Sequence, residues 1–142
     1  MKKIKIFAGL VLISFIAFLA ACGGTASDSD RKVIKSAPIG SNLTATLSND
    51  TGKLKNGEQE IYLAFTDASG KPVDVGSAAL NFNMPAMGTM AEMNDPAALT
   101  TTSTPGLYKG KVNIEMPGEW QAQISYEGTA GKGKTSFPLT AQ

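Results

Sequence analysis

The 142-residue chain contains no histidine and only one cysteine. These two facts exclude several classes of catalytic and metal-binding site. Without histidine there is no Ser-His-Asp or Cys-His relay, no imidazole metal ligand and no histidine pH switch. A single cysteine cannot form an intrachain disulfide, a thiolate zinc site or a redox pair. The sequence therefore predicts that the protein is not an enzyme, and it indicates no organic cofactor.

The chain also lacks an excess of positive charge, with 13 Lys and Arg against 12 Asp and Glu. A nucleic-acid-binding surface needs a basic patch, so nucleic acid is not an expected partner. Residues 128–135 match the P-loop pattern G-x-x-x-x-G-K-[ST]. Only seven residues follow Thr135, with Pro138 among them, which leaves no room for the helix that a P-loop requires. We therefore predict a flexible hairpin there and no nucleotide.

No hydrophobic run is long enough for an ordinary membrane-spanning helix, which needs about 20 residues. Residues 6–21 form an uncharged run of 16 residues after Lys2, Lys3 and Lys5, as in a signal peptide. The run ends in the sequence of residues 19–22, Leu-Ala-Ala-Cys, which resembles the bacterial lipobox. We therefore expect residues 1–21 to be a lipoprotein signal peptide. Cys22 would then carry acyl chains that anchor the protein to a bacterial membrane on its extracytoplasmic side.

The mature chain is expected to consist of a tether and one domain. Residues 22–38 are rich in Gly, Ser, Asp and Lys and predict a flexible linker that follows the lipidated cysteine. From there to residue 142 apolar residues recur with period two, for example at residues 43–47, 61–65 and 120–126, between turn sequences. We predict about seven strands in an antiparallel, immunoglobulin-like β-sandwich over residues 39–142. Trp120 is expected to anchor its core.

Methionine is concentrated in one short segment. Four of the six methionines fall within ten residues at a spacing of three, and a fifth lies before a Pro-Gly turn; these five are Met84, Met87, Met90, Met93 and Met116. Thioethers are soft, neutral ligands that suit Cu(I). We interpret the five as candidate Cu(I) ligands, with Met84 and Met87 as the expected first pair. Two alternatives stay open, because methionines also fill the end of a core or form an adaptable docking surface. Glu92 and Asp95 are interpreted as residues that solvate the loop.

Three motifs in this order resemble the YtkA-like/FixH-like domain. They are Phe-x-Met-Pro-x-Met at residues 82–87, Gly-x-Tyr-x-Gly at 106–110 and Met-Pro-Gly-x-Trp at 116–120. The similarity spans residues 37–140. It implies an immunoglobulin-like sandwich outside the cytoplasm, associated with copper handling and with a copper-handling membrane protein as partner. Many relatives carry histidine near the Met-Pro element, and its absence here favours Cu(I) over Cu(II).

Overall fold

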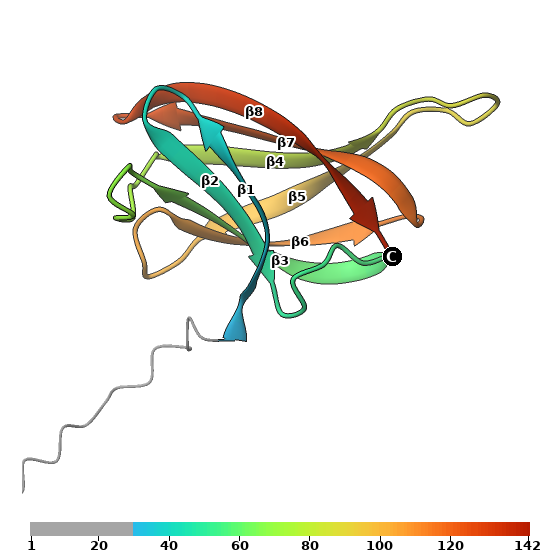
Figure 1. Ribbon diagram of the computed structural model, residues 1–142, viewed down its shortest axis with the longest axis horizontal. Coiled ribbons are helices and arrows are strands. Elements are labelled where there is room, and N and C mark those ends of the chain that lie inside the picture. The colour runs from blue at the N-terminus through green and yellow to red at the C-terminus, as the bar shows by residue number, and fades with distance from the viewer. Residues whose placement is uncertain (1–29) are drawn as a thin grey trace, which may run out of the picture.

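The computed structural model describes residues 30–142, and this part of the chain folds into eight β-strands (Figure 1). The strands are β1 (Lys32–Ile39), β2 (Leu43–Asn49), β3 (Gly57–Thr66), β4 (Ser77–Met84), β5 (Met93–Thr101), β6 (Leu107–Ile114), β7 (Gly118–Gly128) and β8 (Gly131–Ala141). All neighbouring strands pair antiparallel, in the order β1-β2-β3-β6-β5-β4-β7-β8. The predicted all-β fold is confirmed.

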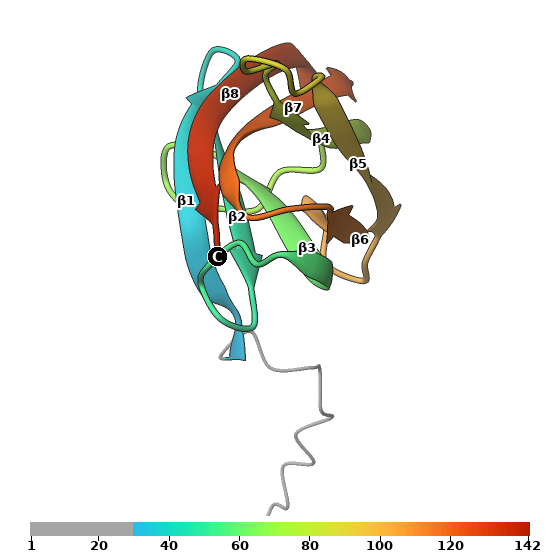
Figure 2. The ribbon, with the colours of Figure 1, turned by 90° about the vertical axis from the view of Figure 1, so that its right-hand side faces the viewer.

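Strand β5 joins the two halves of this fold. Its first residues pair with β4, from Met93 to Ala97, and its last residues pair with β6, from Ala98 to Thr101. The strand thus passes from one sheet to the other, and the eight strands wrap into a sandwich that is nearly closed (Figure 2). Among the described residues no helix is long and apolar enough to cross a bilayer.

Strand β1 occupies residues that the composition assigns to a linker. It pairs with β2 from Lys32 to Ile39, and the Ile39 side chain is only 2% exposed. On its other edge the Lys35 ammonium donates to the Pro138 carbonyl of β8 at 3.1 Å. The folded domain therefore begins at Lys32, before the predicted boundary at residue 38. The hairpin with β2 is local, but the contact with Pro138 of β8 joins residues 103 positions apart in the sequence, so local composition does not reveal it. Cys22 and the signal segment fall outside the described residues.

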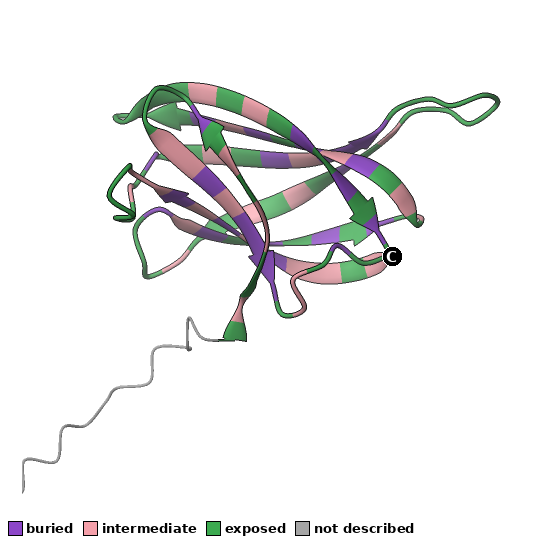
Figure 3. Cartoon of the chain, viewed as in Figure 1, coloured by how far each residue is buried: buried purple, intermediate pink, exposed green. Residues whose placement is uncertain are grey.

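The core lies between the two halves of the sheet and follows the period-two pattern of the sequence. Along β6 and β7 buried residues alternate with exposed or half-buried ones (Figure 3). Trp120 is fully buried, and its indole Nε1 donates to the Met116 carbonyl at 3.0 Å. Phe65 contacts Tyr108 and Tyr126 edge-to-face with ring centroids 5.8 and 5.6 Å apart. The predicted core position of Trp120 is confirmed.

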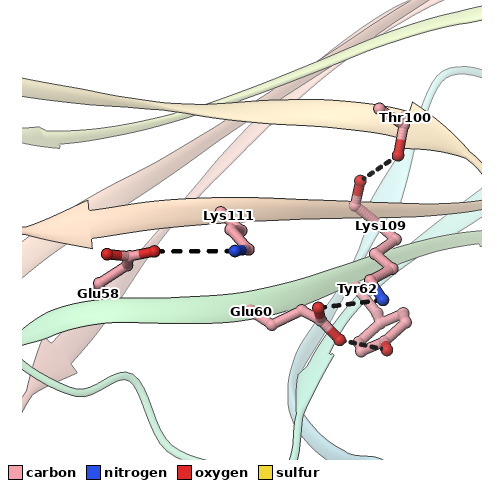
Figure 4. Close-up of polar contacts among 6 residues, drawn as sticks. All are labelled: Glu58, Glu60, Tyr62, Thr100, Lys109 and Lys111. Atoms are coloured by element: carbon pink, nitrogen blue, oxygen red, sulfur yellow. Dashed lines mark hydrogen bonds and ion pairs between the residues drawn. The ribbon is translucent and has the colours of Figure 1, made fainter.

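The outer face of β3 and β6 carries a charged cluster (Figure 4). The Tyr62 hydroxyl donates to Glu60 at 2.5 Å, and the Lys109 ammonium forms an ion pair with the same carboxylate at 3.0 Å. The Tyr62 hydrogen bond and the Lys109 charge hold the pKa of Glu60 below its ordinary value, and the same hydrogen bond raises the pKa of Tyr62. Arg31, just before β1, stacks 4.8 Å from the Tyr62 ring centroid. The cluster therefore links Arg31, the residue before β1, to β3 across the intervening β2.

Candidate metal centre

The methionine-rich segment is a β-hairpin that extends β4 and β5 beyond the body of the sandwich (Figure 1). Met84 pairs directly with Met93 where the two strands meet. Further out, Met87 and Met90 exchange two backbone hydrogen bonds of 3.2 and 2.9 Å. Gly88 has φ of 58°, as a two-residue hairpin turn with glycine in its first central position requires. The hairpin therefore folds symmetrically about Gly88 and Thr89.

This symmetry sorts four methionines into two cross-strand pairs. A residue pair that exchanges both backbone hydrogen bonds has Cα atoms about 5.5 Å apart, with both side chains on the same face. Met87 and Met90 form such a pair at the end of the hairpin, which we call the tip pair. Met84 is paired with Met93 and not with Met87. Pro85 and Gly88, which can turn the backbone, suggest Met84 and Met87 as the first pair, but the register places these two in different pairs.

The tip pair is exposed and the other three methionines are not. Met87 is 61% and Met90 42% exposed, and every residue from Pro85 to Ala91 is exposed and uncharged (Figure 3). Exposure of large apolar side chains has no folding benefit, since the hydrophobic effect favours their removal from water. Within the described residues only Val33 is another large hydrophobic residue as exposed as these. Core filling therefore does not explain the tip pair.

The remaining three methionines lie at the root of the hairpin, and we call Met84, Met93 and Met116 the base group. Met84 is buried, at 3% exposed, while Met93 and Met116 are partly buried and pack against the core. The Met84 methyl reaches β7, because a Cβ added at Gly118 would lie 3.0 Å from it. Gly118 follows Met116 by two residues. The structure thus gathers the base group at one end of the sandwich, near Trp120.

A row of side-chain amides on the outer face fixes the root of the hairpin. The Asn83 amide donates to Glu92 at 2.6 Å and to the Asn94 side-chain oxygen at 3.1 Å. Asn81 donates to the same oxygen at 3.0 Å and to Gln123 at 3.1 Å. These bonds tie β4 to β5 and β7, so both arms of the hairpin leave a rigid support. Asparagine is uncommon in β-strands, so its recurrence at alternate strand positions is a sequence signal that could have identified this row.

The prediction that Asp95 solvates the loop is wrong. The residue is only 8% exposed and lies on the inner face of β5, opposite Phe82. Its Oδ2 accepts a hydrogen bond from the Glu115 backbone N–H at 3.2 Å. Strand β5 pairs with β6 only from Ala98 onward, so the Glu115 N–H has no backbone acceptor on β5. The Asp95 carboxylate accepts its hydrogen bond instead. The period-two pattern that places Met93 inward also places Asp95 inward, and could have shown this.

The methionine side chains of the hairpin and its root are soft metal ligands. Within residues 30–142, no three His, Cys, Asp or Glu side chains gather as ligands for a harder metal ion. A shallow groove of about 850 Å³ lies across β4, β5, β7 and β8. Most of its lining residues are small and uncharged, as Ala78, Pro96 and Ser125 are, and none is a methionine. The hairpin and the groove are therefore separate features, and paired thioethers fit Cu(I) or Ag(I).

Comparison with known proteins identifies the family of the chain. No curated protein and no solved structure gave a significant match. The model of the YtkA-like family matches residues 40–125, which contain β2 to β6, the whole methionine hairpin, Met116 and Trp120. Because this match covers more than half of the chain, the protein belongs to the YtkA-like family.

Proposed function

We propose that the protein is a membrane-anchored extracytoplasmic lipoprotein that binds Cu(I), or delivers it to a copper-handling membrane protein, through its methionine hairpin. The exposed tip pair carries the proposal. Met87 and Met90 lie directly opposite each other on an uncharged turn, where packing gives no reason for two thioethers. Bound Cu(I) would supply a soft monovalent centre that neutral sulfur ligands coordinate without losing a proton.

The other methionines form a second donor group closer to the sandwich. Met84 and Met93 form the other cross-strand methionine pair, three positions away along each arm, so strand alternation turns it to the opposite face of the hairpin. Met116 approaches from the β6–β7 turn as part of the base group. The amide row around Asn83 holds both arms in register, so the sulfur atoms start from a preorganised backbone. The tip pair is accessible to a protein partner, and the base group is shielded.

Anaerobic Cu(I) titration of the purified chain in detergent, in competition with a chromogenic chelator, tests the proposal. We expect the Met87→Leu/Met90→Leu variant to bind Cu(I) at least about tenfold more weakly than the wild type, because leucine preserves apolar volume and removes both thioethers. Thr89→Ala changes the same turn and keeps both sulfurs, so it should bind like the wild type. Equal Cu(I) retention by the wild type and the double variant would contradict a role for the tip pair.

The exposure of the tip also favours a second function, a metal-free docking surface for an envelope partner. Met87 and Met90 present flexible apolar side chains on a projecting turn, as adaptable protein-contact surfaces do. The same titration separates the two functions. A wild-type chain that fails to compete for Cu(I) would leave docking as the better proposal.

Membrane anchoring is the remaining part of the proposal, and it rests on the sequence around Cys22. We expect Cys22→Ala to abolish labelling of the protein by a radioactive fatty acid, since no other cysteine offers a thiol. The variant should either leave the membrane fraction or remain as unprocessed precursor. Persistent labelling of Cys22→Ala would disprove lipidation at this residue.

A further inference from the structure

Asp95 is the single buried charged side chain between residues 30 and 142, and it lies among the base group. On the inner face of the β4–β5 ladder, Met84 stands opposite Met93, and Asp95 stands opposite Phe82 in the next inward position. Asp95 and Met93 are therefore neighbours on the same strand face, with Met84 diagonally across. A carboxylate and two thioethers thus face the same end of the sandwich.

The negative charge of Asp95 has little compensation within the described part of the chain. No ion pair involves it there, and its one hydrogen bond comes from the Glu115 backbone N–H at 3.2 Å. Burial of an ionised carboxylate is costly unless it is paired with a cation, coordinated to a metal or fully hydrogen-bonded. The Glu115 N–H bonds Oδ2 alone, and Oδ1, which has no hydrogen-bond donor among the described residues, is not fully buried and can be reached. The position therefore suits a cation.

We infer that Asp95 supplies the counter-charge for a soft monovalent cation, Cu(I) or Ag(I), held by the base group. The inference rests on the proposed function and adds a second, shielded site with a charged residue. Thioethers are neutral, so a cation bound by them alone would bring an uncompensated positive charge into a poorly solvated place. One carboxylate makes the complex with a monovalent ion neutral overall. A divalent ion would remain positive, so the site should discriminate against it.

Silver(I), which does not change oxidation state in air, is the probe for this site. We expect Asp95→Asn to weaken Ag(I) binding by the purified chain in detergent by about tenfold or more, because a buried opposite charge is screened little. The amide oxygen that this substitution introduces could still accept from the Glu115 N–H, so the metal-free unfolding temperature should remain close to that of the wild type. The matched control is Asp50→Asn, which removes the same charge from an exposed loop residue and should change Ag(I) affinity by less than about twofold.

Two further measurements complete the test. Met84→Leu/Met93→Leu should lose Ag(I) affinity at the same site while keeping apolar volume. In the wild type, labelled at aspartate carboxyl carbons, Ag(I) should shift the Asp95 resonance more than that of Asp50, a readout that does not depend on the folding of any variant. An Asp95 resonance that Ag(I) leaves unchanged would overturn the inference.

The outcomes also distinguish this inference from the proposed function. If the wild type binds neither Ag(I) nor Cu(I), the proposed function fails and the inference fails with it. If the wild type binds and the tip-pair variant Met87→Leu/Met90→Leu loses binding, while Asp95→Asn and Met84→Leu/Met93→Leu retain it, the proposed function stands. In that case the counter-charge role is overturned, and Asp95 acts only as an acceptor for Glu115.

Discussion

Trp120→Ala is expected to lower the free energy of unfolding by about 3–5 kcal/mol, the usual cost of truncating a fully buried tryptophan. The ring is 0% exposed at the start of β7, near the base group. Its removal leaves a cavity between the two halves of the sheet and frees the Met116 carbonyl that the indole N–H contacts. Urea unfolding followed by circular dichroism measures the loss.

Two comparisons make this prediction specific. Trp120→Phe keeps most of the apolar volume and loses the hydrogen bond to Met116, so its cost should be clearly smaller than that of alanine. Val33→Ala removes two methyl groups from a residue that is 60% exposed and should change stability by less than about 0.5 kcal/mol. If Trp120→Ala proved as mild as Val33→Ala, the central position of the ring in the core would be refuted.

Gly106→Ala is expected to have the second largest effect on stability. Gly106 has φ of 75°, a conformation that costs a residue with a side chain about 1–2 kcal/mol. A Cβ there would also lie 2.4 Å from the Val73 carbonyl oxygen, and relief of such a clash typically costs about 1–3 kcal/mol. Since the Phe65 N–H donates to the Gly106 carbonyl at 2.8 Å, movement of this turn would disturb β3.

Gly70→Ala separates the two contributions. Gly70 has φ of 82°, and no atom lies within 4 Å of the Cβ that alanine would add, so this variant measures the backbone cost alone. The difference between the two variants in urea unfolding reports the contact with Val73. Equal losses in the two variants would show that the Val73 carbonyl moves away at no cost.

The methionine site illustrates how far the sequence could be interpreted. The cluster itself is evident from composition, and the spacing of three is symmetric about Gly88 and Thr89. A two-residue turn centred there pairs Met87 with Met90 and Met84 with Met93. Without a known turn centre, the turn-forming residues Pro85 and Gly88 suggest Met84 and Met87 instead. Register depends on the turn geometry, and a shift of one residue would reverse the face of every side chain.

The all-β class, the core position of Trp120 and the family motifs were determined by the sequence alone, because the period-two pattern and the turn residues are local signals. Only the tertiary structure decided that Lys32–Ile39 is a strand, since its linker-like composition hides the hairpin with β2 and its contact with Pro138 of β8 lies outside any local window. It likewise decided that the tip pair is exposed while Asp95 is buried beside the base group. Burial is a property of the assembled sheet, which places residues far apart in sequence around one side chain.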